Sequence, residues 1–261
     1  MLKNAPNSLL HIADVSGSAL FQGDCLDIMP LIPDKSVQLI LADLPYNMTA
    51  NKWDCLIDIN KLWNEYERIL TDNGCVLLFA IQPFATDLII SKRNWFKYDW
   101  ILPKARYSRQ TQAKRMPLLA HEYVLTFYPK QTKYKPYTNE VNNLGGKKPT
   151  VTKTENYLIP NQNNYVRPEF KTKNTFLPKK GVEDRGLHPT QKSLEVVSFL
   201  IETYTDENDF VLDNTMGSGT TCLAAKELNR NFIGIEKDET YFKIAEKRIK
   251  EAQKSVTQKL F

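Results

Sequence analysis

The chain has 261 residues, of which 42% are hydrophobic and 25% are charged, with a formal net charge of +5. This composition is typical of a globular protein with a sizeable core, and it excludes collagen-like and low-complexity chains. The sequence contains no apolar run of the roughly 20 residues that a membrane-spanning helix needs and no signal-peptide pattern, so we expect a cytoplasmic protein.

The four cysteines lie far apart in the sequence and form no C-x-x-C pair: Cys25, Cys55, Cys75 and Cys222. This spacing argues against a disulfide framework and against a zinc site, and it suits a reducing compartment. We therefore expect no metal ion.

The first 128 residues alternate between apolar runs typical of buried parallel strands and segments with helical spacing. Strands are expected at residues 19–22, 37–42, 75–81, 98–102 and 123–128. Helices are expected at residues 25–31, 58–70 and 84–92, and Asp72, Asn73 and Gly74 are expected to end the second helix.

Periodicity stops at residues 129–186 and then resumes, with helices expected at residues 194–204, 220–228 and 241–252 and strands at 210–213 and 232–235. Asp238 is placed to cap the last helix. The pattern predicts one α/β domain, residues 1–128 and 187–261, with a mostly parallel sheet and helices on both faces. Residues 129–186 are too long for an ordinary connection and are expected to form an insert.

The positive charge is concentrated in one part of the chain. Residues 104–186 contain 17 Lys and Arg against 6 Asp and Glu, or +11, and the remainder contains 18 against 24, or −6. This asymmetry points to a polyanionic partner, although solvated lysines in a loop region would produce the same balance.

A strand that ends in Asp213 is followed at once by a glycine turn and a helix. Such a turn lets a nucleotide-like ligand lie against backbone N–H groups. Cys222 stands where a dinucleotide fingerprint has its third glycine, and no Walker Gly-Lys-Ser/Thr follows. A ligand with ribose and adenine but no pyrophosphate fits better, namely S-adenosylmethionine, with Glu236 at the next strand end accepting from the ribose hydroxyls. The alternative is that the glycines only turn the chain and bind no ligand.

The segment Asp43-Leu44-Pro45-Tyr46 follows the buried strand at residues 37–42. It combines a carboxylate, a backbone with proline-fixed geometry and an aromatic ring at one strand end. Together these groups offer a polar acceptor beside a stacking surface. In isolation, a turn cap and a core aromatic explain the same residues.

Four segments resemble motifs of the β-class of DNA amino-methyltransferases, and the catalytic motif, the insert, the H-P-T-Q-K segment and the cofactor motif follow one another in the order of that class. Residues 43–46 resemble the D-P-P-Y motif, residues 188–192 the H-P-T-Q-K segment, residues 213–221 the D-P-F-x-G-x-G-T motif, and Gly23-Asp24 the acidic residue that binds the cofactor's adenine. The resemblance implies a circularly permuted, Rossmann-like methyltransferase fold that binds S-adenosylmethionine. It covers residues 19–128 and 186–250. The insert, residues 129–186, carries no family motif and is expected to be the basic, DNA-binding part that recognises the target sequence.

The chain departs from the family pattern at three places. Leu44 replaces the first proline of the catalytic motif, where the family uses the backbone carbonyl. Asn214 and Thr215 replace the usual Pro-Phe, so the aromatic wall beside the cofactor is either missing or supplied by another part of the chain. Ser193 stands where proline often follows H-P-T-Q-K.

The resemblance implies roles for individual residues. The catalytic residues are Asp43, Leu44, Pro45 and Tyr46, with Tyr46 stacking on a flipped-out base. The cofactor-binding residues are Asp24, Cys25, His188, Thr190, Gln191, Lys192, Asp213, Thr215, Met216, Gly217, Ser218, Gly219, Thr220, Thr221, Glu236 and Lys237. Three residues after a strand of the catalytic domain are expected to contact DNA phosphates: Lys104, Arg106 and Arg109.

The predicted reaction is site-specific methylation of adenine N6 in double-stranded DNA, because Asp43 opens a motif that more often begins with Ser in the cytosine-N4 members. Cytosine N4 is the alternative. A catalytically silent protein that binds the cofactor or nucleic acid is a second alternative, and a nicotinamide-dependent oxidoreductase a third. A homodimer and a cognate restriction endonuclease stay open, as do the recognition sequence and the insert residues that read it.

Overall fold

Strand β3 (Val37–Ala42) is apolar at nearly every position because both of its faces are covered. Ile40 and Ala42 belong to one hydrophobic core, and Leu39 and Leu41 belong to a second core on the opposite face of the sheet. The computed structural model describes residues 10–13, 17–45, 57–141, 170–177 and 191–258.

The chain divides into two units, residues 1–134 with 175–261 and residues 135–174. The predicted insert, residues 129–186, encloses the smaller unit. In the smaller unit, β7 (Tyr137–Val141) and β8 (Phe170–Thr172) form a two-stranded antiparallel sheet. The assignment of catalysis to one part and DNA recognition to the other stays a prediction.

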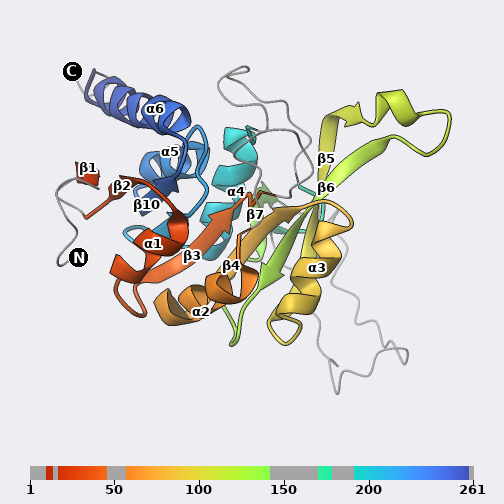
Figure 1. Cartoon of the computed structure of the whole chain (residues 1–261), viewed down its shortest axis with the longest axis horizontal. Coiled ribbons are helices and arrows are strands. Elements are labelled where there is room, and N and C mark those ends of the chain that lie inside the picture. Colours follow the sequence, from red (N-terminus) through yellow and green to blue (C-terminus); the bar gives the residue numbers. More distant parts are fainter. Residues whose placement is uncertain (1–9, 14–16, 46–56, 142–169, 178–190, 259–261) are drawn as a thin grey trace. The chain divides into compact units, whose positions relative to one another are not determined.

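The larger unit contains an eight-stranded sheet in the order β1-β2-β10-β9-β3-β4-β6-β5 (Figure 1). Neighbouring strands from β2 to β4 in this order run parallel, and β1 and β6 run antiparallel to their neighbours. The predicted, mostly parallel sheet is therefore confirmed. Besides β3, its strands are β1 (Leu10–Ala13), β2 (Ala19–Gln22), β4 (Leu70–Ala80), β5 (Phe96–Ser108), β6 (Leu119–Phe127), β9 (Phe210–Asp213) and β10 (Asn231–Glu236).

Helices cover both faces of this sheet, as predicted (Figure 1). One core contains side chains of α1 (Cys25–Ile28), α2 (Ile59–Ile69) and α3 (Phe84–Ser91). The other contains side chains of α4 (Leu194–Tyr204), α5 (Thr220–Glu227) and α6 (Glu239–Gln258). Short 3-10 helices lie at η1 (Met29–Leu31) and η2 (Gln110–Gln112). The predicted cap of α6 is confirmed, because Asp238 Oδ1 accepts from the backbone N–H groups of Thr240 and Tyr241.

The second helix ends within one residue of the predicted Leu70, but the expectation that residues 72–74 terminate it is wrong. Helix α2 ends at Ile69, and β4 begins at Leu70 and contains the Asp-Asn-Gly segment. Pairing with β3 jumps from Val37↔Leu70 to Leu39↔Cys75, so the turn-like residues form a bulge within the strand. Hydrogen bonds from neighbouring segments to the Asn73 carbonyl hold this bulge in place.

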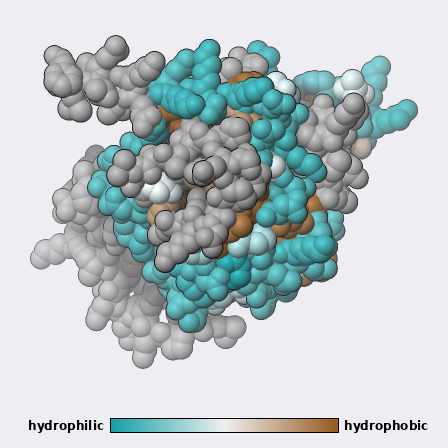
Figure 2. All heavy atoms as spheres, turned by 60° about the vertical axis from the view of Figure 1, so that its left-hand side comes forward, coloured by the Kyte–Doolittle hydropathy of each residue, from teal (hydrophilic) through white to brown (hydrophobic). Residues whose placement is uncertain are grey.

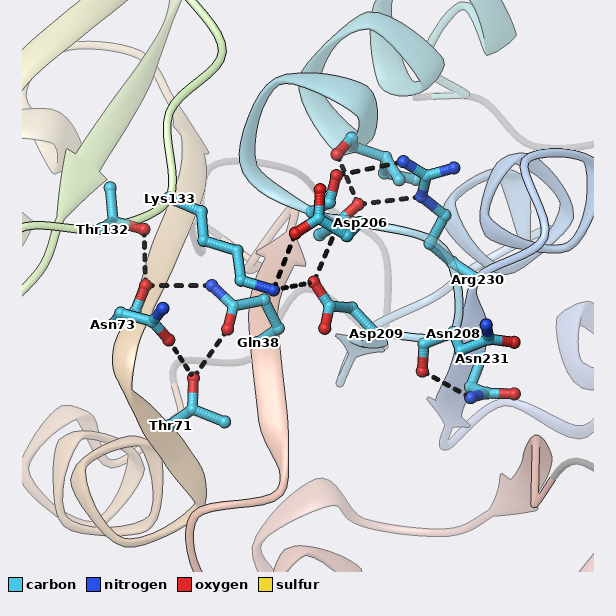
Figure 3. A network of polar contacts seen from close by, with 12 residues as sticks. Gln38, Thr71, Asn73, Thr132, Lys133, Asp206, Asn208, Asp209, Arg230 and Asn231 are labelled. Carbon is cyan, nitrogen blue, oxygen red and sulfur yellow. Dashed lines mark hydrogen bonds and ion pairs between the residues drawn. The ribbon is translucent and has the colours of Figure 1, made fainter.

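A polar network lies near the amino-terminal ends of β3, β9 and β10 (Figure 3). Lys133 Nζ contacts Asp206 Oδ2 at 3.0 Å and Asp209 Oδ2 at 2.8 Å. Gln38 Nε2 donates to the Asn73 carbonyl at 2.9 Å. This network pairs polar side chains at the amino-terminal ends of the strands, on the side of the sheet opposite to the strands' carboxyl ends.

Strands β5 and β6 extend well beyond the predicted 98–102 and 123–128 into a hairpin (Figure 1). Pairing reaches Ser108↔Leu119, and the connection contains η2. Local periodicity underestimates these strands because the side chains of residues 104–108 are half-buried or exposed, so the distal part carries no apolar run.

Most of the visible described surface is hydrophilic, with hydrophobic residues showing in patches (Figure 2). Among the described residues, none of the helices has the length and hydropathy needed to cross a bilayer.

The glycine at position 234 allows β10 to pack against the neighbouring core. A Cβ there would lie 2.5 Å from Met216 Sδ and 2.7 Å from both Cys222 Sγ and Leu20 Cδ2. We expect Gly234→Ala to lower the free energy of unfolding by about 1–3 kcal/mol through overpacking, measured by urea denaturation. The exposed Lys247→Ala serves as the control and should shift it by less than about 0.5 kcal/mol. Equal stability of G234A and wild type would contradict this packing.

Candidate functional site

The carboxyl ends of β3 and β9 meet at the centre of the sheet. The two strands pair in parallel, β3 continues to β4 on one side, and β9 continues to β10 on the other. A ligand site is expected at such a topological switch point. Asp43 follows β3, Asp213 ends β9 and Glu236 ends β10, so the fold brings these three predicted residues to one edge.

The glycine turn connects β9 to α5 through two glycines with left-handed backbone. Gly217 has φ +51° and Gly219 has φ +77°. A Cβ on Gly219 would also lie 2.8 Å from the Cβ of Ala245, so both conformation and space require glycine there. The predicted residues of this turn, Met216, Ser218, Thr220 and Thr221, are buried.

Backbone hydrogen bonds fasten the turn to β10. Met216 N–H donates to the Ile235 carbonyl at 3.0 Å, and Gly217 N–H donates to Glu236 Oε2 at 2.8 Å. From α6, Arg248 Nη1 donates to the Ser218 carbonyl at 2.7 Å. The turn is therefore held by two elements that follow it in the chain.

Asp213 is buried, and burial raises the pKa of its carboxyl group to about 7. The Thr221 side chain and the Thr215 N–H donate to this group and partly oppose the shift. The proximity of Asp43 and Glu236 adds to the rise. Three carboxyl groups thus share one edge of the sheet.

Glu236 is held in a single orientation. Its Oε2 accepts from Gly217 N–H and its Oε1 from Asp238 N–H, each at 2.8 Å. Burial raises the pKa of this carboxyl group as well. A fixed carboxylate at the end of β10 suits the acceptor role predicted for it.

The end of β2 lies beside the end of β10, because Gly23 N–H donates to the Glu236 carbonyl at 2.9 Å. Asp24 caps α1 through Leu26 N–H and contacts Lys237 Nζ at 3.0 Å. Burial opposes ionisation of Asp24, but these two donors lower its pKa. Cys25 is buried next to this cap, and burial raises the pKa of its thiol to about 11.

The two departures from the family's Pro-Phe sequence make hydrogen bonds to other elements. Asn214 Oδ1 accepts from the buried Tyr66 hydroxyl of α2 at 2.6 Å. Thr215 Oγ1 donates to the Asp43 carbonyl at 3.1 Å. These polar side chains therefore tie the glycine turn to α2 and to the segment after β3.

Asp43 contacts Lys192, a residue that the sequence assigns to cofactor binding. Lys192 Nζ lies 3.0 Å from Asp43 Oδ2 and 2.9 Å from Glu122 Oε2. It also lies 4.8 Å from the centre of the Phe79 ring. Burial opposes the charge of Lys192, but Asp43 and Glu122 outweigh this effect and raise its pKa.

Other predicted residues are placed as follows. Leu44 is buried and Pro45 is half-buried directly after Asp43. Gln191 precedes Lys192, and its Oε1 is buried with no hydrogen-bond partner among the described residues. Tyr46, His188 and Thr190 lie outside the described residues.

The three residues predicted to contact DNA lie on the β5–β6 hairpin and differ in their surroundings. Arg106 is exposed and Arg109 half-buried. Lys104 pairs with Glu122, and its side chain is 20% exposed. The hairpin carries two further basic residues, Lys114 and Arg115, in its exposed connection.

The sequence did not single out three residues that hold the site together: Tyr66, Glu122 and Arg248. Tyr66 was expected only as an apolar position of a helix. Glu122 and Arg248 belong to no motif. Glu122 contacts Lys192, 70 residues away, and Arg248 contacts Ser218, 30 residues away. Local pattern therefore offered no signal for them.

A family model described as DNA methylase, covering N6 and N4 methyltransferases, matches residues 37–247. The chain belongs to this family. The match includes the segment after β3 and the glycine turn.

Two curated relatives are Type II methyltransferases. This DNA methylase is 26% identical over 247 residues to M1.MboII of Moraxella bovis, covering 85% of this chain and 92% of that protein. It is 52% identical over 67 residues to M.HindIII of Haemophilus influenzae, covering 26% of this chain and 22% of that protein.

Solved structures share the fold. The crystal structure of an M1.HpyAVI–SAM complex matches with a TM-score of 0.60 and 26% identity, covering 88% of this chain and 98% of that chain. The PvuII DNA methyltransferase, described as cytosine-N4-specific, matches with a TM-score of 0.61 and 15% identity, covering 90% of both chains. The DNA methylase thus has the Rossmann-like methyltransferase fold, permuted so that the strand before Asp43 precedes the strand before the glycine turn.

The raised pKa of Asp213 predicts a pH-dependent stability. The unfolded chain loses this proton near the ordinary pKa of 3.8, whereas the folded chain keeps it up to about pH 7. Ionisation therefore favours the unfolded state, and the contribution of Asp213 to the free energy of unfolding falls between about pH 4 and 7.

Urea denaturation of wild type and Asp213→Asn without cofactor, between pH 5 and 8, measures this effect. We expect the stability of wild type relative to D213N to fall as the pH rises towards 7 and then to level off. A difference that does not vary with pH would contradict the assignment.

Proposed function

We propose that this DNA methylase transfers a methyl group from S-adenosylmethionine to the exocyclic N6 of adenine in double-stranded DNA. The observation that carries the proposal is the position of Asp43. This residue directly follows β3, and its backbone carbonyl accepts a hydrogen bond from Thr215 Oγ1 of the glycine turn. An acceptor for the amine and a nucleotide-binding turn thus lie on adjacent strands.

The described residues fit the cofactor. Glu236 offers a carboxylate oriented by the Gly217 and Asp238 N–H groups, and the half-buried Gly217 exposes backbone without a side chain beside it. The unpaired Gln191 Oε1 offers a buried acceptor at the same edge. We assign binding to these residues, to Asp24, Cys25 and Lys237, to the turn at residues 213–221, and to Lys192, His188 and Thr190 as the resemblance implies.

When bound, S-adenosylmethionine supplies an electrophilic methyl group on a sulfonium. The exocyclic amine of adenine is a poor nucleophile because its lone pair is delocalised into the ring. The Asp43 carboxylate and the Leu44 carbonyl accept hydrogen bonds from its two N–H groups, which favours a pyramidal nitrogen. They also stabilise the positive charge that develops on it. A strong base is not required before the transfer, since the positively charged methylated amine that forms is acidic and readily loses a proton.

The target base is reached only outside the duplex, so the proposal includes base flipping, with Tyr46 as the stacking partner. Pro45 restricts the backbone between the acceptor carbonyl and this ring. Correct placement of the amine supplies much of the rate.

Adenine is proposed over cytosine because Asp43 opens the catalytic motif, where cytosine-N4 members more often have serine. The Type II names of M1.MboII and M.HindIII support a role in protecting cytoplasmic DNA against a cognate restriction endonuclease. A homodimer stays a prediction.

Sequencing of single DNA molecules from a methylation-free host expressing the chain tests the function. We expect N6-methyladenine within one sequence context. Asp43→Ala should leave no modified base while its affinity for S-adenosylmethionine, measured by calorimetry, stays within about threefold, because Asp43 acts on the target amine.

N4-methylcytosine in place of N6-methyladenine would establish the cytosine alternative. Unmodified DNA from a folded wild-type chain that binds the cofactor would reject the enzymatic function. Methylation by D43A at the wild-type rate would remove Asp43 from the mechanism.

The proposal assigns phosphate contacts to the basic β5–β6 hairpin and to the basic insert. Lys104 keeps this role only if a phosphate shares or replaces its ion pair with Glu122. We expect the double variant Arg106→Ala/Arg109→Ala to weaken DNA binding and to reduce the slope of log K against log[salt] by up to about two, roughly one per lost phosphate contact.

Lys243→Ala/Lys247→Ala is the matched control, since it removes the same charge from exposed positions of α6. Fluorescence anisotropy with a labelled duplex at several salt concentrations measures both slopes. An equal reduction in the two double variants would show that net charge, and not hairpin contact, sets the slope.

A further inference from the structure

Four charged side chains of alternating sign contact one another in space, from the β5–β6 hairpin to the proposed catalytic segment after β3. Lys104 pairs with Glu122, Glu122 Oε2 lies 2.9 Å from Lys192 Nζ, and Lys192 Nζ lies 3.0 Å from Asp43 Oδ2. Between 14% and 22% of each side chain is exposed. We call these four residues the charge chain.

The tertiary structure builds the charge chain from separate elements. Lys104 and Glu122 lie on the paired strands β5 and β6, Lys192 directly precedes the residue before α4, and Asp43 follows β3. Glu122 contacts both lysines and therefore lies at the centre of the pairing.

The charges of the chain depend on one another. Burial opposes ionisation of Glu122, but Lys192 and Lys104 outweigh it and lower the pKa of Glu122 to about 2. A buried ion pair is strongly disturbed when one partner is removed, because the remaining charge loses its compensation. Glu122 is thus the group that keeps the Lys192 ammonium shared between two carboxylates.

Lys192 is confined by three contacts: Asp43, Glu122 and the Phe79 ring. An ammonium has three N–H donors, so the direction of one of them depends on where the others are held. Without Glu122, the ammonium is free to move towards Asp43 and to compete with the target amine for its carboxylate.

We infer that Glu122 is a positioning residue for methyl transfer, which holds Lys192 and through it sets the orientation of the Asp43 carboxylate. The inference rests on the proposed role of Asp43 in binding the target amine. It also gives Lys192 a second role besides cofactor binding, because its ammonium contacts the Asp43 carboxylate.

Single-turnover rates of methyl transfer at saturating cofactor and DNA test this inference. We expect Glu122→Gln to lower the rate between about 10-fold and 100-fold, as a misplaced acceptor does, while the affinity for S-adenosylmethionine changes less than threefold. Glu122→Asp, which restores the charge on a shorter side chain, should recover part of the rate.

A double-mutant cycle tests whether Glu122 acts through Lys192. If it does, Glu122→Gln/Lys192→Met is no slower than Lys192→Met alone, because the residue that transmits the effect is already gone. The control is Lys92→Met, which removes a lysine that likewise pairs with a carboxylate, Glu67, and lies over an aromatic ring, Trp95, away from the predicted site residues, and it should leave the transfer rate unchanged.

A wild-type transfer rate in E122Q, an effect confined to cofactor affinity, or additive effects in the double variant would each overturn the inference. If E122Q does not fold, Glu122→Asp carries the test, and a wild-type rate in that variant overturns the inference too. Transfer by the wild-type chain, measured first, tests the proposed function separately from the role of Glu122.

Discussion

Parallel pairing of β3 with β9 is the constraint on which the site depends. The register Leu39↔Val211 and Ile40↔Leu212 joins segments that are about 170 residues apart in the sequence. Because the strands run in the same direction, the residues after them emerge at one edge, and Thr215 hydrogen-bonds to the Asp43 carbonyl there. The apolar sequence of β3 serves this arrangement, since two cores hold the strand from both sides.

Electrostatic compensation differs between the two halves of this edge. Asp213 and Glu236 are compensated by N–H and hydroxyl donors of the glycine turn, and burial leaves their pKa values raised. Asp43 instead lies against the Lys192 ammonium. Asp213 and Glu236 thus have neutral donors as partners, whereas Asp43 has a cation.

One departure from the family pattern is accompanied by hydrogen bonds to other elements. Where the usual motif has proline and phenylalanine, Asn214 and Thr215 make hydrogen bonds to Tyr66 and to Asp43. These hydrogen bonds attach the turn to α2 and to the segment after β3. Leu44 is buried and belongs to the core that contains Ile40 and Ala42. Nothing among the described residues explains Ser193, whose buried hydroxyl has no hydrogen-bond partner there.

By itself, the sequence determined the alternation of helices and strands and the family motifs, because periodicity and motif spacing are local properties. Only the tertiary structure decided that Asp72, Asn73 and Gly74 bulge within β4 and that β5 and β6 extend into a long basic hairpin. The tertiary structure also decided that Glu122 meets Lys192. Such contacts depend on which strands become neighbours, and strand order arises from packing over the whole sheet.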